Sequence, residues 1–462
     1  MSHLSVARRY ARFVLGLTGP GIPAPVTAKA AVLMLDTLGS CLASSREDFG
    51  RAVLDSAERL GGPQESTLIG TKAKAGAASA ALANATLAHG LDFDDTREDA
   101  IVHTGCVAVT AALAAAEAAG AAGREALAAA IAAVEVMCRV GLTVPGAFHA
   151  RHFHPTAITA SFAAAAAAAR IRKLSEDRLV QAFGICGSQA AGIIEYLADG
   201  TWTKRLHPGW NAHAGMIATL LAETGFTGPE TVLEGAHGLY AAFAGGHDAG
   251  RLEELLATLG GAWELAELTF KPYPCGSIAQ PYMDCAMRLR TQHQIAPGDI
   301  RAITCRTAAG PLPRLWEPLT SKHAPPNGYA AKFSLPYLVA VIMVKGRAGL
   351  AEFEDRAVRD ADVLAVTRRV TYVIDPAIDY PRQFVGDVEI TLADGRVLRE
   401  RQDRPRGGPD APLAREELAA KFRGNAGALP PARIERVIRL VDTLDTAATL
   451  ADLFTALAPE RS

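Results

Sequence analysis

The chain has 462 residues, 49% of them hydrophobic, which is enough to bury a large core divided over two or three domains. Its 47 basic and 49 acidic residues are interspersed and give a net charge of -2, so nothing indicates a nucleic-acid or membrane-surface partner. Seven cysteines without a CxxC pair argue against a disulfide scaffold and a thiolate zinc site, and they fit a reducing cytoplasm best.

The first half of the chain is predicted to be helical. Arginines scattered among apolar residues in Met1–Leu17 favour an amphipathic helix over a signal peptide. From residue 5 to about 265, alanine and leucine recur at helical spacing, for example in Val107–Val140, with Gly120 and Gly123 as breaks. The alanine-rich run 157–169 is too short and too weakly apolar to cross a bilayer. We expect a bundle of closely packed helices and no membrane span.

Between about residues 269 and 405, helical spacing gives way to the alternating pattern of strands. Alternating β-branched residues predict strands at Ile300–Thr307, Arg369–Ile374 and Asp387–Arg401, the last broken by a turn at Ala393–Gly395. A helix is expected at Ser334–Gly346. After the loose stretch Arg404–Pro412, helices are predicted again at 414–423, 431–444 and 447–457.

These elements predict a mainly α fold. A large helical domain is expected to be built from both ends of the chain, residues 1–268 and 409–462. A smaller α+β domain, residues 269–408, is expected to be inserted between the two helical portions.

The first candidate site is His89-Gly90-Leu91-Asp92-Phe93-Asp94-Asp95-Thr96, which is followed by His103. Three aspartates within four positions are costly unless they are solvated, bound to a cation or able to share protons. Asp94 and Asp95 could instead cap a helix, which is the commoner role of a single aspartate. The cluster is therefore a hypothesis for acid–base chemistry, in which we expect Asp92 to act and Asp94 and Asp95 to be structural.

Three further segments have the composition of sites. His152 and His154 lie in a Pro-interrupted segment, where His152 is expected at the surface. The segment 199–211 contains Lys204, Arg205 and His207 among glycines and prolines, and is predicted to be a loop that suits an anion. The stiff turn 271–277 is a candidate hinge or the root of a lid.

Two other functions were weighed against these segments. The Asp92–Asp95 pattern matches the acid motif of class II terpene cyclases, but the chain is only 6% aromatic and could hardly line a carbocation cavity. A magnesium-dependent diphosphate enzyme needs a second acidic motif, and the helices offer none. Glycine-rich nucleotide loops are also absent from the sequence, so no nucleotide cofactor is indicated.

Together the segments resemble the MmgE/PrpD family, which includes 2-methylcitrate dehydratase, cis-aconitate decarboxylase and iminodisuccinate epimerase. The resemblance covers nearly the whole chain. It rests on the stretch 88–96, His154-Pro155, Thr203-Lys204 with His207 and Gly209, Lys271-Pro272-Tyr273-Pro274, Lys332-Phe333-Ser334-Leu335-Pro336-Tyr337, and the tail Glu416 to Phe422. It implies a helical domain made from both chain ends, a smaller α+β lid domain, and a homodimer.

Carried over by motif, the family's active-site positions fall on Asp92, Thr96, His103, His154 and Lys204. His207, Lys271 and Tyr273 are expected to help bind substrate, and no metal ligand is assigned. The chain departs from the family at Gly276, where the decarboxylase branch has a histidine, and at Gln280, where many relatives have another. This departure argues against itaconate-forming decarboxylation and leaves methylcitrate unassigned as a substrate.

The resemblance implies chemistry through a carbanion or enolate-like species next to a carboxylate. Lys204, with His207, would bind the carboxylate of a small anionic substrate, Thr96 would position an oxygen, and His103 or His154 would move the proton, tuned by Asp92. We therefore expect a cofactor-independent lyase of the dehydratase type acting on a small hydroxy di- or tricarboxylate. An epimerase of a substituted succinate, a decarboxylase of an aconitate-like acid and an inactive family member remain the alternatives.

Overall fold

The structure is a computed structural model that describes residues 4–380 and 382–459. These residues form two compact units: Met1–Leu268 with Ala414–Ser462, and Thr269–Leu413. The chain is 59% helical and its sheets are small, which confirms the mainly α fold with a smaller α+β part.

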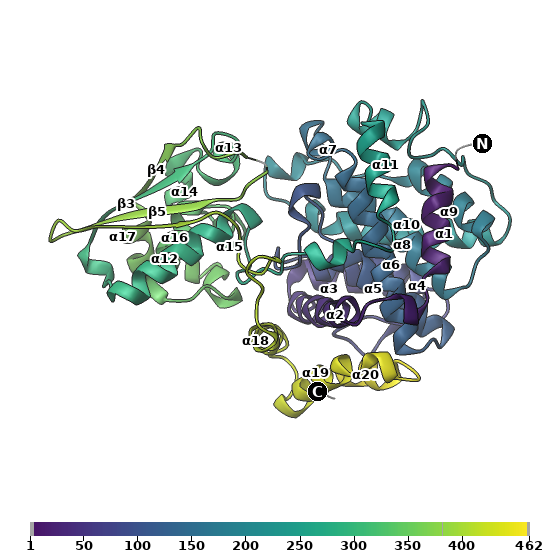
Figure 1. Cartoon of the computed structure of the whole chain (residues 1–462). Helices are drawn as coiled ribbons and strands as arrows, with labels where there is room; N and C mark the ends of the chain where they lie inside the picture. The colour runs from purple at the N-terminus through teal and green to yellow at the C-terminus, as the bar shows by residue number, and fades with distance from the viewer. Residues whose placement is uncertain (1–3, 381, 460–462) are drawn as a thin grey trace. The chain divides into compact units, whose positions relative to one another are not determined.

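The described part of the first unit consists mainly of helices, most of which Figure 1 labels, with one two-stranded ribbon. Its helices are α1 (Val6–Gly16), α2 (Ala24–Ser44), α3 (Asp48–Leu60), α4 (Ala77–His89), α5 (Gly105–Ala119), α6 (Gly123–Leu142), α7 (Ala147–Ala150), α8 (Pro155–Ile171), α9 (Glu176–Gln189), α10 (Thr203–Glu223), α11 (Ala249–Ala257), α18 (Arg415–Asn425), α19 (Pro431–Asp442) and α20 (Ala451–Leu457). The ribbon pairs β1 (Ser66–Thr67) with β2 (Lys74–Ala75) in antiparallel fashion.

The amphipathic helix expected near the N-terminus is α1. The Ser5 hydroxyl accepts a hydrogen bond from the Arg8 backbone N–H and caps it, while Tyr10 and Val14 are buried along one face. Residues 1–3 of the predicted stretch lie outside the described residues. The breaks expected at Gly120 and Gly123 are also confirmed, since α5 ends at the left-handed Gly120 (φ 61°) and α6 begins at Gly123.

Helix α10 packs closely against α4 and α8 because glycines face them. A Cβ on Gly209 would lie 2.1 Å from the Thr86 Oγ1 atom of α4, and one on Gly215 would lie 2.3 Å from the Ser161 carbonyl oxygen of α8. Backbones that approach this closely leave no room for any side chain. The start of α10 is thereby held at the C-terminal end of α4. The aspartate cluster follows directly after this end.

Helix α2 is long and apolar enough to cross a membrane, but 72% of its apolar window is buried within this fold. Its Asp36 carboxylate is buried and lies 2.7 Å from the ammonium of Lys421 in α18. A buried ion pair with a helix from the other end of the chain is typical of a core helix in a globular unit. The two chain ends are thus joined in one core, with α18 beside α2 (Figure 1).

The last helix begins later than the sequence predicts. A helix over 447–457 is expected, but residues Leu444–Thr446 form a short 3-10 turn and α20 starts only at Ala451. Ala447 is extended, and its carbonyl accepts a hydrogen bond of 2.9 Å from the Gly123 N–H at the start of α6. This tertiary contact removes the residue from the helix in spite of the high helix propensity of alanine.

The second unit contains a four-stranded sheet in the order β4-β3-β5-β6. The strands are β3 (Ile300–Thr307), β4 (Val370–Ile374), β5 (Gly386–Leu392) and β6 (Val397–Gln402), and the helices are α12 (Gln280–His293), α13 (Leu312–Leu315), α14 (Leu319–His323), α15 (Gly328–Ala331), α16 (Leu335–Lys345) and α17 (Ala361–Thr367). β3 pairs parallel with β4 and antiparallel with β5. The strands and the helix at 334–346 predicted from the sequence are confirmed.

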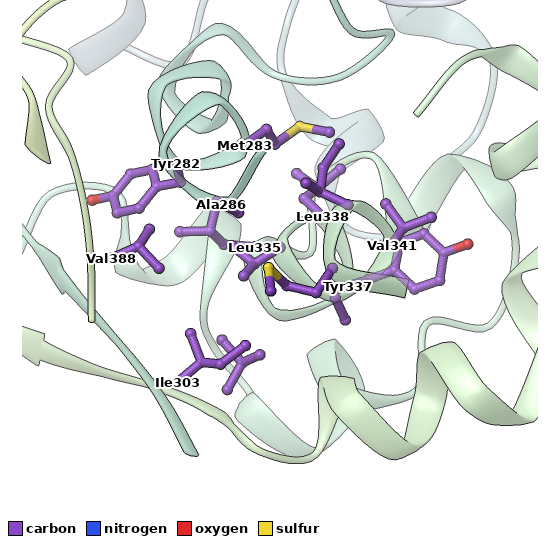
Figure 2. Packing of buried hydrophobic residues seen from close by; sticks show 14 of the residues in the cluster. Tyr282, Met283, Ala286, Ile303, Leu335, Tyr337, Leu338, Val341 and Val388 are labelled. Carbon is purple, nitrogen blue, oxygen red and sulfur yellow. The ribbon is translucent and has the colours of Figure 1, made fainter. Parts of the chain in front are cut away.

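The core of this unit lies between the sheet and the helices α12 and α16. Figure 2 shows Tyr282, Met283 and Ala286 of α12 facing Leu335 and Leu338 of α16, with Ile303 and Val388 of the sheet beside them. The predicted hairpin joins β5 to β6 with Thr391 opposite Val397, and the positive φ of Gly395 (89°) makes the turn possible. The second unit therefore has a hydrophobic core of its own.

Candidate active site

Polar side chains gather where the ends of four helices of the first unit meet. His89 is the last residue of α4, His103 lies two residues before α5, His154 is the N-cap of α8, and Lys204 is in the first turn of α10. The ring centroids of His89 lie 4.9 Å from His103 and 5.4 Å from His154, and His207 lies 5.4 Å from His154. We call His89, His103, His154 and His207 the histidine cluster.

Lys204 and Asp92 form a buried ion pair beside this cluster. The lysine Nζ donates to Asp92 Oδ1, and the two residues are 8% and 2% exposed. Asp92 has a positive φ of 55°, which is uncommon for a residue with a side chain but tolerated best by aspartate and asparagine. Gly90 permits this turn, because a Cβ there would lie 2.3 Å from the Phe49 ring. A strained turn that presents a buried carboxylate is typical of a functional site.

His103 is oriented by the segment that precedes it. Its Nδ1 lies 2.8 Å from the Asp95 carbonyl oxygen and 3.1 Å from Thr96 Oγ1. A carbonyl oxygen can only accept, so this contact assigns the hydrogen of the neutral ring to Nδ1 and the lone pair to Nε2. His103 is therefore held in the tautomer that can exchange a proton through Nε2.

Asp94 contacts two of the histidines. Its Oδ2 accepts a hydrogen bond of 2.7 Å from His89 Nδ1, and its Oδ1 lies 3.8 Å from His103 Nδ1. These contacts add Asp94 to the residues that orient the histidines, and the expectation that Asp92 tunes them stays a prediction. The positive φ at Asp92 turns the chain, so the neighbouring carboxylates point to different helices.

Asp95 caps α5, as the simpler interpretation of the cluster proposes. Its carboxylate accepts hydrogen bonds from the Thr104 backbone N–H (3.1 Å), the Thr104 hydroxyl (2.6 Å) and the Gly105 N–H (2.8 Å). Burial, and then the nearby Asp94 charge, raise the pKa of Asp95 to about 6. This carboxylate fixes the start of α5 and with it the position of His103.

His154 and His207 form the other half of the cluster. Their Nδ1 atoms are 3.3 Å apart, and Tyr196 lies against both rings at centroid distances of 6.3 and 5.8 Å. Burial lowers the pKa of His154 well below its usual value, and the nearby His89 and Lys204 lower it further. The same causes lower the pKa of His207 to about 4. Both rings are therefore neutral near pH 7 and can accept a proton.

The prediction of an anion-binding loop over residues 199–211 is wrong for residues 203–211. Residues 203–211 belong to α10, with Pro208 inside the helix, so Lys204 and His207 lie one turn apart on one helix. Tertiary packing of the two glycines against α4 and α8 outweighs the local Gly and Pro signals. The expected exposure of His152 is confirmed.

Sequence reasoning missed His89 and Tyr196. His89 is 1% exposed and its Nε2 has no hydrogen-bond partner within the described residues. Its position as the last residue before the aspartate motif was the available signal. His89, Asp94 and Cys106 also offer three potential metal-ligand atoms within 4.8 Å of one another. Burial raises the pKa of the Cys106 thiol, which disfavours the thiolate that a metal would need.

Lys271 and Tyr273 belong to the second unit. Both are buried, and the Tyr273 hydroxyl donates to Asp284 Oδ1 at 3.0 Å. Gln280 fixes the same turn, since its side chain accepts from the Tyr273 N–H (3.2 Å) and donates to the Tyr273 carbonyl (2.9 Å). Gly276 has an ordinary φ of -57° and room for a Cβ, 3.6 Å from the Phe333 ring. The substrate-binding role of Lys271 and Tyr273 stays a prediction.

The low histidine pKa values predict that the first unit loses stability on acidification. An unfolded histidine has a pKa of about 6.5. Below this pH the unfolded chain binds protons at His154 and His207, whereas the same rings stay neutral in the folded protein because their pKa values are lowered. We expect the free energy of unfolding to fall between pH 6.5 and about 4, by about 1.4 kcal/mol per pH unit for each such proton. The pKa of Asp95 is raised to about 6, so the folded protein binds a proton there before the unfolded chain does. Over part of this pH range Asp95 therefore raises the free energy of unfolding on acidification.

A comparison of variants isolates the histidine contribution. Urea unfolding curves of the wild type and of His207→Asn are recorded at several pH values. The free energy of unfolding should fall less steeply with decreasing pH in the variant than in the wild type. The exposed His152→Asn variant is the matched control and should follow the wild type. Equal pH slopes for wild type and His207→Asn would contradict the buried neutral ring.

The fold and the site define a class of protein. A helical unit built from both chain ends holds the neutral imidazoles of His154 and His207 next to a buried lysine. The chain matches the MmgE/PrpD N-terminal domain over residues 8–252 and the MmgE/PrpD C-terminal domain over residues 273–446. It belongs to the MmgE/PrpD family, which confirms the resemblance seen in the sequence.

The similar proteins include decarboxylases and a dehydratase. The cis-aconitate decarboxylase-like protein oryM of Aspergillus oryzae is 24% identical, over 99% of this chain and 98% of its own. The cis-aconitate decarboxylase of Mus musculus is 26% identical, over 96% and 91%. The 2-methylcitrate dehydratase of Cupriavidus necator is 33% identical over 190 residues, which are 38% of this chain and 37% of its own. These relatives support an enzyme related to dehydratases and decarboxylases.

Proposed function

We propose that the protein is a lyase of the dehydratase type that acts on a small hydroxy di- or tricarboxylate without a cofactor. The observation that carries this proposal is the placement of His103, His154, Lys204 and His207 at the N-terminal ends of α5, α8 and α10. Helix N-terminal ends carry partial positive charge and bind anions. A carboxylate there would meet a lysine and neutral imidazoles together.

The residues have separate tasks in this proposal. Lys204 binds the carboxylate next to the reacting carbon and stabilises the enolate-like charge that forms when the proton leaves. His154, neutral because of its low pKa, accepts that proton. His103, in its protonated form beside the Asp94 carboxylate, donates the proton on Nε2 to the departing hydroxyl, so water leaves, a carbon–carbon double bond forms and the ring returns to the neutral tautomer. Thr96 holds a substrate oxygen. The reverse assignment of the two histidines is the alternative.

A decarboxylase of an aconitate-like acid is the second candidate. The specific observation in its favour is that the relatives matched over more than nine-tenths of both chains are named cis-aconitate decarboxylases or decarboxylase-like. Gly276 counts against it, because this chain lacks the histidine that the decarboxylase branch has there. An epimerase of a substituted succinate would use the same acid–base pair.

One assay distinguishes these reactions. The full chain is incubated in deuterated water with citrate, 2-methylcitrate, cis-aconitate and substituted succinates. A dehydratase gives an ultraviolet-absorbing alkene, a decarboxylase releases carbon dioxide, and an epimerase incorporates deuterium and keeps the carbon skeleton. Activity that survives dialysis against a chelator would agree with cofactor-independent chemistry. If no acid reacts in any of these ways, the proposal fails and an inactive family member is favoured.

We also propose a homodimer, with α10 and its N-cap as the contact surface. Trp202 at the N-cap and Leu206, Trp210 and Leu220 in the helix are 39–49% exposed. Exposed large apolar side chains on one helix are typical of a protein interface. Trp210→Glu is expected to shift the protein to monomer in sedimentation velocity at micromolar concentration, and Leu60→Glu, at another exposed leucine, is the control. A wild type that is monomeric would contradict the proposal.

A cytoplasmic location and the absence of nucleic-acid or membrane partners stay predictions.

A further inference from the structure

A second pocket with a surplus of positive charge lies far from the histidine cluster. It has a volume of about 430 Å³ and lies between the ends of α1 and α8 and the start of α6. His154 caps the first turn of α8, whereas Arg170 of this pocket lies in the last turn of the same 17-residue helix. At 1.5 Å per residue the two ends are about 25 Å apart. The pocket is therefore separate from the proposed active site.

Three cationic side chains line this pocket: Arg124, Arg170 and Lys173. Glu125 is the one acidic residue among those that line it. Within the part of the chain that the structure describes, none of the three cations has a carboxylate oxygen within 4.0 Å. Such a surplus of unpaired positive charge around a concave surface attracts anions.

Arg170 is the most informative of the three residues. One of its terminal nitrogens, Nη1, donates a hydrogen bond of 2.7 Å to the Val14 carbonyl at the end of α1. Its Nε is buried and has no hydrogen-bond partner within the described residues. A buried donor without an acceptor is costly, and a charged one more so. The bond to Val14 gives one nitrogen a structural role, and the buried Nε does not open into the pocket. The part of the Arg170 guanidinium that lines the pocket, with the exposed cations Arg124 and Lys173, is what an anion would meet there.

Most of the rest of the pocket is apolar. Leu15, Leu17, Ala128, Ile171 and Leu174 line it, together with Thr18 and Gly19. Ligand sites of a few hundred Å³ usually combine an apolar wall with a few convergent polar groups. Cations on one side and aliphatic side chains on the other fit a small molecule with an anionic head and a short apolar body.

We propose that this pocket binds a small organic anion, a carboxylate or a phosphate ester with a short aliphatic chain, at a site separate from the active site. Arg170 holds the head group through its guanidinium, and Arg124 and Lys173 neutralise the remaining charge. The aliphatic chain lies against Leu17 and Ile171. The proposal does not depend on the reaction that the histidine cluster catalyses.

Titration calorimetry of the full chain with four probes tests the binding. Hexanoate and hexyl phosphate carry both parts of the expected ligand, acetate and inorganic phosphate only the head group. We expect the hexyl compounds to bind and the short anions to bind more weakly, and the tighter of the two hexyl compounds identifies the head group. Absence of heat with either hexyl compound up to about 10 mM, the range of very weak affinity, would overturn the proposal.

Two variants make the test specific. Arg124→Gln with Lys173→Asn removes two exposed cations, and asparagine tolerates the positive φ of 56° at position 173. We expect this double variant to weaken hexyl-compound binding about tenfold or more, as loss of two charge-assisted contacts should. Arg172→Gln, an exposed cation next in sequence that pairs with Glu223 instead, is the matched control. Undiminished binding in the double variant would refute the site.

Lys204→Met with Asp92→Asn separates this proposal from the proposed function. It removes both charges of the buried ion pair of the active site and should leave hexyl-compound binding unchanged. If binding is lost in this variant and retained in Arg124→Gln with Lys173→Asn, the probe occupies the active site and the second pocket is not a ligand site. Failure of the dehydratase assay has no bearing on either result.

Discussion

Lys204→Met is expected to lower kcat/KM by about 10³ or more on whichever acid supports turnover, since it removes the cation that faces the developing negative charge. It should also lower the free energy of unfolding by about 3–5 kcal/mol, because Asp92 is left as a buried carboxylate without its partner. Steady-state kinetics and urea unfolding measure the two effects separately.

A double variant separates catalysis from folding. Lys204→Met with Asp92→Asn removes both charges and should recover much of the lost stability while remaining inactive. Lys72→Met, at an exposed lysine elsewhere in the first unit, controls for the loss of a positive charge. If the doubly substituted protein recovers activity together with stability, Lys204 has a structural role and does not bind substrate.

His103→Asn is expected to lower kcat about 10²–10⁴-fold, the range for the loss of a general acid or base, with little change in KM. Asparagine keeps a donor for the Asp95 carbonyl, so the local fold should survive. His152→Asn is the control because this histidine is exposed. Far-ultraviolet circular dichroism shows whether the variant is folded.

The pH profile identifies the role of His103. If His103 is the acid and His154 the base, the alkaline limb of the kcat profile should disappear in His103→Asn, and the acid limb should remain. A kcat near the wild-type value would mean that His103 is not part of the reaction. A loss of the acid limb instead would assign His103 as the base.

The fold was largely predictable because its signals are local. Alternation in Ile300–Thr307 and helical spacing in Val107–Val140 depend on which face of each element is buried, and both the strand and the two helices are confirmed. The errors lie where a distant contact competes with a local preference. Ala447 leaves its predicted helix to bond with Gly123, and Pro208 is accommodated within α10.

The candidate site was predictable in part. The motif at 88–96 and the order of the segments indicate the family, and they draw attention to His103, His154 and Lys204. They do not say which aspartate meets which partner. His89 was part of the quoted motif but was given no role, because its place before the aspartates does not show that its ring meets Asp94.

The sequence by itself determined most of the secondary structure, the family and the residue types available for chemistry, because periodicity and motif spacing are properties of neighbouring residues. Only the tertiary structure decided the pairings. Asp92 meets Lys204 across 112 positions, and His154 meets His207 across 53, because α10 packs closely against α4 and α8. A turn with positive φ at Asp92 then directs Asp94 to the histidines and Asp95 to α5. Side-chain direction at such a turn depends on a backbone conformation that the packing stabilises.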